Sequence, residues 1–320
     1  MNNIARKHHF IPEFFLAGFT QTGLKDTLLC VFDKKEVRQL KLLPKNIAMS
    51  KGFYAIKTTP HSKIKPDELE RLIGQFENEV APIIREIGNT EKLPRGKEFI
   101  LLLHFFALLA ARTPTKKELL IGPEEKIINQ YFKIILSSEE MWKAALAKTG
   151  LQQDDLDYNL MKENLLGVKM TQHGYIERML EEAQDYAKLL SRREWTLGIT
   201  DERSNEFVCS DYPLLLLPVR CGFGTPGSLV AFPVNKRMVL MGYLTKEMKG
   251  GAFIESKKMM VEDVAFINRW LISYSERFIY SSSEDIIWMC NDGKIGKKGD
   301  LVEAYKRKHN ITISKGGGNV

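Results

Sequence analysis

The stretch GKEFILLLHFFALLAAR, residues 96–112, is apolar on nearly every side of a helix. A helix of that composition is buried in a protein core. Its apolar run contains His104 and is too short to span a bilayer. Pro114 follows closely and stops the helix, because proline lacks a backbone N–H and restricts the residue before it. We therefore expect a central buried helix that ends at Arg112.

Amphipathic helices surround this segment in a helical region that covers residues 66–193. Proline and acidic residues near position 66 are typical of a helix start, and apolar residues then recur at helical spacing. The same spacing predicts further helices over residues 123–136, 138–148 and 172–190.

The two flanking parts have strand patterns. In residues 1–56 a buried run and an alternating run enclose a polar turn, which predicts a hairpin over 28–43, with one more strand at 53–56. Residues 194–293 are mixed: strands are expected at 195–199, 206–209, 228–234, 238–243 and 278–281, a helix at 261–273, an apolar run between prolines at 213–218, and a short helix or strand at 284–289. Residues 294–320 form a basic, partly disordered tail.

These patterns predict an α+β fold, with short N-terminal and C-terminal strands in a mixed or antiparallel sheet around the central helical region. The chain shows no internal repeat and no obvious linker, so we expect one interlocked domain over residues 1–320. The first and last parts are expected to share a sheet, with the helices against one side.

Composition narrows the class of protein. The net charge is +7 and the isoelectric point about 9.0, a balance that suits RNA, DNA or a nucleotide as partner. The four cysteines are far apart, which argues against a zinc site and for reduced thiols. The N-terminus lacks the apolar core of a signal peptide. We expect a cytoplasmic protein without a membrane span; the oligomeric state is left open.

The pair His8-His9 stands before an aromatic-rich run. Neighbouring side chains of a strand point to opposite faces, so one histidine at most faces a given pocket. Histidine suits proton transfer near neutral pH. The alternative is a packed histidine that pins the N-terminus. No further histidine or acid follows at metal-ligand spacing.

Arg112-Thr113 ends the buried helix, where a charged group is costly to bury without a partner. Arg112 binds an anion or forms a structural salt bridge, and the helix dipole alone favours a cation there. His104 lies eight residues earlier and shares roughly one face with Arg112. Together they suit a phosphate, although a core histidine is the more favoured interpretation of His104.

Two further motifs carry polar side chains. Ser210-Asp211 follows an expected strand and precedes Pro213, where Asp211 orients a histidine, holds a cation or simply caps a turn. Asn268 lies on the apolar stripe of the expected helix 261–273, and a buried amide needs partners. It lines a pocket or makes a structural hydrogen bond. The P-loop, nucleophile-elbow and H-E-x-x-H signatures are missing.

In order along the chain, these motifs resemble the bacterial and fungal family called domain of unknown function 4238. The resemblance runs from about His8 to Ser281 and rests most on the His-His-x-x-Pro opening. The weaker pieces are Asn46-Ile47-Ala48, Phe53-Tyr54, Arg112-Thr113-Pro114, Ser210-Asp211-Tyr212-Pro213, Phe232-Pro233 and Ile267-Asn268. The family often has Asn-Pro after Ser-Asp, whereas this chain has Tyr212-Pro213. The resemblance implies a fold unit and a candidate site, and no reaction.

Our hypothesis is a nuclease-like hydrolase of RNA or DNA, with a role as a toxin or defence effector. Its catalytic groups are His8 or His9, Arg112 and Asp211, and its substrate-binding groups are Thr113, Ser210, Asn268 and His104. The histidine acts as general acid or base, and Arg112 stabilises the charge that develops on the phosphorane-like transition state. Asp211 orients the histidine or holds a divalent cation such as magnesium.

Two other interpretations stay open. One is a non-catalytic module that senses a nucleotide or a protein with the same pocket; the other is a set of polar groups that only specifies the fold. Geometry separates them. Histidines more than about 10 Å from both Arg112 and Asp211 leave no shared catalytic network.

Overall fold

The computed structural model describes residues 7–54, 68–149, 157–164, 167–200, 205–218, 221–245, 256–296 and 305. The helix start expected at Pro66 and the part of the tail for which disorder was expected lie outside these residues. By contacts, the chain divides into one compact unit of residues 1–113 with 180–320 and a second of residues 114–179. The first unit thus contains both ends of the chain.

The second unit is helical. It contains α4 (Pro114–Ile135), α5 (Glu139–Thr149), α6 (Tyr158–Asn164) and the start of α7 (Gln172–Leu190). A small core of Ile135, Leu136, Trp142 and Leu146 holds α4 to α5. The helix expected from Pro123 begins instead at Pro114 and runs through Pro123. Proline is well placed at the first position of a helix, where its missing N–H has no bond to make.

The buried central helix is confirmed in the first unit as α3 (Lys97–Ala111). It packs beside α2 (Glu68–Thr90), whose buried residues lie on one stripe. Only a narrow face of α3, which includes Ile100 and His104, is exposed. A helix that is apolar nearly all round is therefore covered on almost all sides.

A five-stranded sheet lies beside α3. Its order is β10 (Lys257–Lys258), β5 (Glu194–Ile199), β9 (Met238–Tyr243), β8 (Leu229–Asn235) and β7 (Leu215–Leu217), antiparallel except for β10 with β5. Phe106 of α3 contacts Phe232 of β8, with ring centroids 4.5 Å apart. Ala231, the neighbour of Phe232, belongs to the core around α8 (Val261–Tyr274). Both faces of the sheet are thus buried, which explains why β8 is apolar from Leu229 to Val234 instead of alternating.

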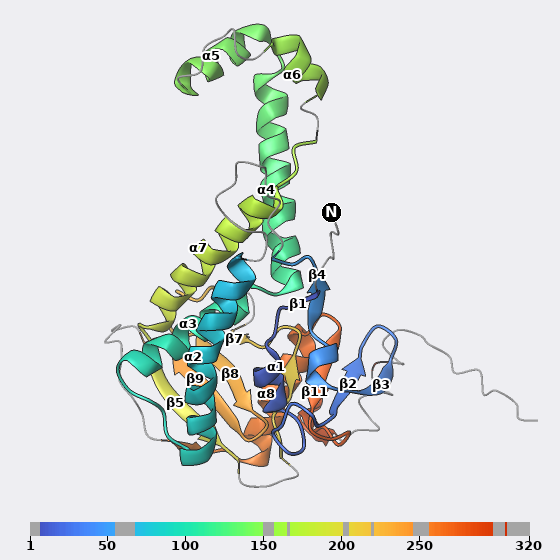
Figure 1. The fold of residues 1–320 in the computed structure, drawn as a ribbon, viewed down its shortest axis with the longest axis vertical. Coiled ribbons are helices and arrows are strands. Elements are labelled where there is room, and N and C mark those ends of the chain that lie inside the picture. Colours follow the sequence, from blue (N-terminus) through green and yellow to red (C-terminus); the bar gives the residue numbers. More distant parts are fainter. Residues whose placement is uncertain are drawn as a thin grey trace, which may run out of the picture. The chain divides into compact units, whose positions relative to one another are not determined.

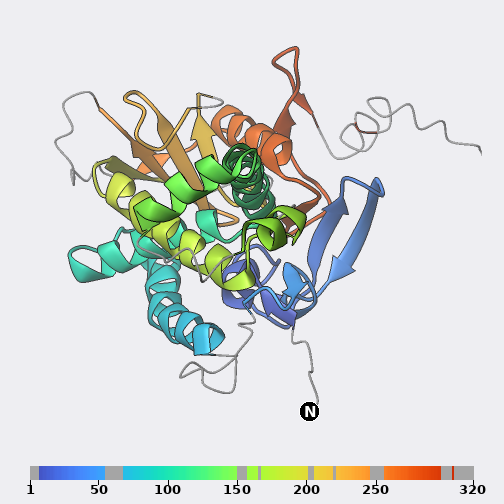
Figure 2. The same ribbon diagram turned by 90° about the horizontal axis from the view of Figure 1, so that it is seen from above.

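The N-terminal and C-terminal parts share a four-stranded sheet, as expected. Its order is β3 (Arg38–Leu42), β2 (Leu29–Asp33), β11 (Phe278–Ser281) and β6 (Cys209–Ser210). β2 and β11, far apart in the sequence, pair antiparallel with Val31 opposite Tyr280 (Figure 1). Figure 2 shows the same neighbourhood from above, with the blue hairpin beside the orange segments. Long-range pairing of this kind closes the first unit.

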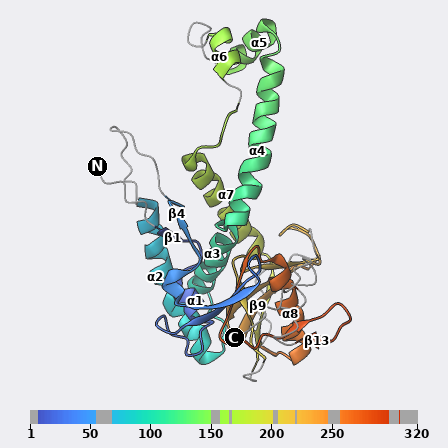
Figure 3. The same ribbon diagram turned by 90° about the vertical axis from the view of Figure 1, so that its right-hand side faces the viewer.

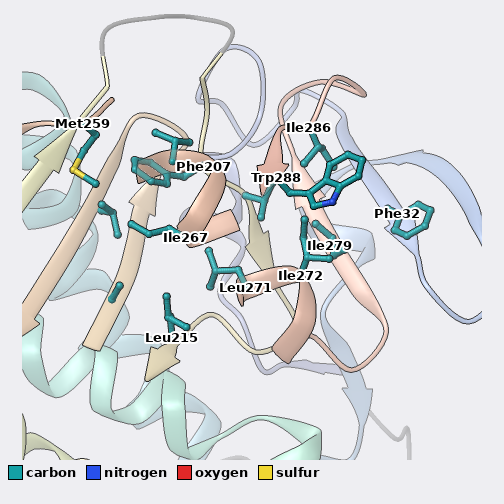
Figure 4. Packing of buried hydrophobic residues seen from close by; sticks show 14 residues of the cluster. Phe32, Phe207, Leu215, Met259, Ile267, Leu271, Ile272, Ile279, Ile286 and Trp288 are labelled. Carbon is teal, nitrogen blue, oxygen red and sulfur yellow. The ribbon is translucent and has the colours of Figure 1, made fainter. Parts of the chain in front are cut away.

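The apolar side chains of α8 join the two sheets into one core. Ile267, Leu271 and Ile272 point between Phe207 and Leu215 on one side and Ile279 and Trp288 on the other (Figure 4). The mixed α+β architecture is therefore held together by one buried helix on each side of the five-stranded sheet.

Several expected strands differ in extent. The strand expected at 53–56 is wrong for Phe53 and Tyr54, which lie in a turn, and residues 55–56 lie outside the described ones. A strand that was not expected, β4 (Met49–Lys51), precedes them and pairs with β1 (Lys7–His9). The run 206–209 is a strand only at β6, and the run 284–289 only at β12 (Trp288–Met289), which pairs with β13 (Ile295–Gly296). In the part of the chain that the structure describes, no single helix is long and apolar enough to cross a membrane.

The close approach of β5 and β9 depends on a glycine. Gly242 lies opposite Trp195, and a Cβ at Gly242 would come within 2.6 Å of the buried indole ring. We predict that Gly242→Ala lowers the free energy of unfolding by about 1–3 kcal/mol, because overpacking displaces a rigid side chain. Gly74→Ala in α2, where nothing lies within 4 Å, should instead stabilise by up to about 1 kcal/mol. Urea titration measures both; equal effects would contradict the packing argument.

Candidate functional site

Strand β1 places the two histidines. It pairs with β4 so that His8 lies opposite Ser50 and His9 opposite Met49, and both strands lie beside α2 (Figure 3). Side chains alternate along the strand, and His8 is buried whereas His9 is half-buried. The two rings therefore have different surroundings.

The ring of His8 is held by structural contacts. Its Nδ1 accepts a hydrogen bond of 2.8 Å from the backbone N–H of Tyr54, and its ring stacks on the Tyr54 ring. Its Nε2 lies 3.3 Å from Glu70 Oε2 of α2. Because Nδ1 is the acceptor, the ring proton belongs on Nε2, facing the carboxylate. His8 thus ties the N-terminal strand to Tyr54 and α2.

The ring of His9 lies among groups that suit proton transfer. The carboxylates of Glu13 and Glu77 and the backbone carbonyl of Lys45 face it. Burial lowers the pKa of His9 below its ordinary 6.5, although the two carboxylates raise it. Nε2 of His9 is covered and has no hydrogen-bond partner among the described residues. His9 is therefore neutral at pH 7 and has one ring nitrogen not engaged by the protein.

Arg112 follows the last residue of α3 and is fully buried. Its Nη1 lies 2.7 Å from Oε1 of Glu77, an ion pair whose angles fall short of a hydrogen bond. Nε and Nη2 make no hydrogen bond of good geometry in the described part of the chain, although the Tyr54 hydroxyl lies within reach of the guanidinium. Burial works against the charge, but Tyr54 and Glu77 more than offset it and raise the pKa of Arg112. The guanidinium is therefore charged, and its donors are not saturated by well-aligned hydrogen bonds.

Tyr54 links the histidine pair to the arginine. Its hydroxyl donates to the backbone carbonyl of His9 at 3.4 Å and lies close enough to Arg112 for the two to interact electrostatically. Burial raises the pKa of Tyr54 to about 12, so the phenol keeps its proton. The structure thus joins His8, His9 and Arg112, three of the predicted site residues, through Tyr54 and Glu77.

These contacts give the group its chemical capacity. A neutral imidazole beside carboxylates accepts a proton, and a carboxylate stabilises the imidazolium that results. A buried guanidinium with unsaturated donors binds an oxyanion strongly, because little water competes. We call His9, Glu13, Glu77, Tyr54 and Arg112 the His9 cluster.

Sequence reasoning missed both glutamates of the His9 cluster. Glu77 falls on the apolar stripe of α2, between Ile73 and Val80. A charged carboxylate at a core-facing position is costly to bury unless a cation lies beside it. The position of Glu77 on the apolar stripe could therefore have indicated a buried ion pair. Tyr54 belonged to the family pattern but had no assigned role.

Three other predicted site residues have contacts of their own. Asp211 accepts hydrogen bonds from the backbone N–H groups of Glu276, Arg277 and Phe278, at 2.7–2.9 Å. Asn268 accepts from the N–H of Val208 and donates to two backbone carbonyls. Ser210 closes a turn with Tyr212. Within the described ranges, none of these hydrogen bonds reaches the histidines; the catalytic and binding roles of the three residues stay predictions.

His104 is exposed, so the expectation of a core histidine was wrong. Eight residues at about 100° each leave His104 about 80° around the helix from Arg112. That angle is enough to put one side chain in solvent and the other in the core. Thr113, next to Arg112, is fully buried.

A second buried arginine was not anticipated. Arg193 donates hydrogen bonds to the carbonyls of Ser228, Gly242 and Phe223 and to the Ser228 hydroxyl. Burial lowers its pKa to about 10. These bonds engage both Nη atoms, so Arg193 fixes the loop before β8. Among the described residues, no group of three or more His, Cys, Asp or Glu side chains is arranged to hold a metal ion.

Comparison with known protein families gives a match over most of the chain. A model of the family described as "Protein of unknown function (DUF4238)" matches residues 7–285. No curated protein and no solved structure matches. The matched residues include the whole His9 cluster.

The Arg112–Glu77 pair makes a testable contribution to stability. Glu77→Gln keeps the shape of the side chain but leaves the buried guanidinium without a counter-charge. We expect the free energy of unfolding to fall by about 3 kcal/mol. The control is Glu79→Gln on the exposed side of α2, which should change it by less than about 0.5 kcal/mol. A double variant, Glu77→Gln with Arg112→Met, should recover part of the loss; urea titrations showing none would contradict the ion pair.

Asp211→Ala leaves three backbone N–H groups without their acceptor. We expect a loss of about 3 kcal/mol in unfolding free energy, measured by thermal and urea unfolding. Asp211→Asn retains one acceptor oxygen and should lose less. Asp185→Ala, which removes only an exposed ion pair, is the control. An Asp211→Ala protein as stable as the control would show that these three hydrogen bonds do not hold the loop.

Proposed function

We infer that this chain, which belongs to the DUF4238 family of proteins of unknown function, is a nuclease-like hydrolase of RNA or DNA. One observation carries the proposal: an unengaged imidazole nitrogen of His9 and the unsaturated donors of the buried Arg112 occur in one cluster, joined by Glu77 and Tyr54. Phosphodiester hydrolysis needs such a base and such an anion-binding group.

The steps follow from these groups. Neutral His9 takes a proton from water as the water oxygen bonds to phosphorus. Arg112 donates hydrogen bonds to the phosphoryl oxygens, where negative charge grows. Glu77 holds His9 in place and stabilises the imidazolium. The bond from phosphorus to the leaving sugar oxygen then breaks, and that oxygen takes a proton from solvent.

The net positive charge of the chain supports a polyanionic substrate. Four cationic side chains also line a cavity beside the His9 cluster. A second candidate is the non-catalytic sensor module. The complete burial of Arg112 favours the sensor module. A sensor only has to recognise its ligand, whereas an enzyme also has to release a product from the buried group.

Incubation of purified protein with tRNA, single-stranded RNA and DNA, with and without magnesium, tests the proposal. Wild type should cleave, and His9→Gln should cut at least about 100-fold more slowly, because the base is lost. His173→Gln, on an exposed histidine of α7, is the control. Intact nucleic acid under every condition would contradict the hydrolase proposal and favour the sensor module. Cleavage by His9→Gln at the wild-type rate would contradict the assignment of His9 as the base.

The pH dependence has a defined sign. The pKa of His9 is lowered from 6.5, so the neutral base persists to pH values below 6.5. We expect the cleavage rate to be flat from pH 8 to 6.5 and to fall only as the pH drops through the lowered pKa. The same titration should reduce stability below pH 6.5, because the unfolded state takes up the proton first. A rate that rises on acidification would contradict His9 as the base.

A further inference from the structure

A cavity of about 640 Å³ lies in the first unit, between α1 (Glu13–Ala17), the loop after it, the second half of α2 and the turn between β8 and β9. That volume falls in the range of small-molecule sites. The His9 cluster does not explain it, because none of the five residues of that cluster lines it.

The lining of this cavity carries one sign of charge. Lys25, Arg85, Lys236 and Arg237 line it, and no acidic residue does. Lys236 pairs with Glu206 at 3.3 Å, and Arg237 lies 3.7 Å from Glu91. In the described structure Lys25 and Arg85 contact no acid. Two positive charges are therefore left to attract an anion.

Amides complete the polar side. Asn78, Asn89 and Asn235 line the cavity. Oδ1 of Asn235 accepts from the N–H of Arg237 at 2.8 Å, which directs its Nδ2 the other way. A Cβ at Gly88 would meet that Nδ2 at 3.6 Å, so the missing side chain of Gly88 leaves the amide reachable. No hydrogen bond from Nδ2 to a described residue occurs.

An apolar wall faces these groups. Phe14, Phe15, Ile84, Val234 and Met238 belong to the same lining. Phe14 is half-buried, and its ring is fixed against Phe105 with centroids 5.6 Å apart. A fixed aromatic ring beside aliphatic side chains forms an apolar surface that suits a planar ring of a ligand.

The walls are held in place before any ligand binds. Lys236 donates from its backbone N to the carbonyl of Gly18, at 3.1 Å, and from Nζ to the carbonyl of Gln21, at 2.8 Å. The N–H of Gly23 donates to the Thr20 hydroxyl, which shapes the loop that carries Lys25. Gly23 has a φ of 79°, a conformation that favours glycine. Preorganised walls reduce the entropy lost on binding.

We propose that this cavity binds a nucleotide, with the phosphate at Lys25, Arg85 and Asn235 and the base on the apolar wall. The cavity adjoins the His9 cluster, because Phe14 follows Glu13 on α1 and Asn78 follows Glu77 on α2. Its use as a subsite for nucleic-acid substrate rests on the proposed hydrolysis, whereas the binding itself does not.

Calorimetric titration of the full chain with adenosine 5′-monophosphate, adenosine and inorganic phosphate tests the binding. The monophosphate should bind most tightly. Arg85→Gln should weaken it about tenfold, and Lys25→Gln with Arg85→Gln about 100-fold, since each charged hydrogen bond is lost. Lys92→Gln, an exposed cation outside the lining, should leave affinity unchanged.

Shape is tested separately from charge. Gly88→Leu places a side chain in the cavity and should abolish binding, whereas Gly74→Leu on the same helix, in open space, should not. Wild-type affinity in Gly88→Leu, or phosphate binding as tightly as the monophosphate, would overturn the proposal. Cleavage of nucleic acid without monophosphate binding would contradict the proposed nucleotide site and leave the proposed hydrolase intact. Monophosphate binding without cleavage would contradict the hydrolase and leave the nucleotide site intact.

Discussion

The charge of Arg112 is fully buried at the end of an apolar helix, and this condition organises the first unit around it. A guanidinium in that position must have a counter-charge, and Glu77 provides it from α2. The pair thus sets how α2 lies against α3. Tyr54 then faces the same charge, and through Tyr54 the strand that carries both histidines is tied to the core. One buried cation therefore joins segments that are otherwise far apart in the chain.

Apolar packing on both faces of the five-stranded sheet also joins distant segments of the chain. The five-stranded sheet is covered by α3 on one face and α8 on the other, so neighbouring residues of β8 contact different helices. Trp195 fills the space over Gly242, and Arg193 binds the carbonyl of that glycine. Polar and apolar contacts thus hold the same two interior strands, β5 and β9.

The helices α1 and α2 each contribute residues both to the His9 cluster and to the cavity. Glu13 and Glu77 face His9, and their sequence neighbours Phe14 and Asn78 line the cavity. Consecutive residues of a helix point about 100° apart, so each helix has one face toward the His9 cluster and another toward the cavity. The proposed hydrolysis and the proposed nucleotide binding would therefore use different faces of the same two helices.

What the sequence by itself determined is mostly local. Periodicity identified α3, α7, α8 and the β2–β3 hairpin, because these elements depend on neighbouring residues. Motif order pointed to His8, His9 and Arg112, which the structure joins. Tertiary structure alone decided that Glu77 and Tyr54 join them, that β2 pairs with β11, and that Asp211 binds the backbone at residues 276–278. These contacts depend on packing between distant segments, and no local pattern in the sequence records which segments come together or which groups pair there.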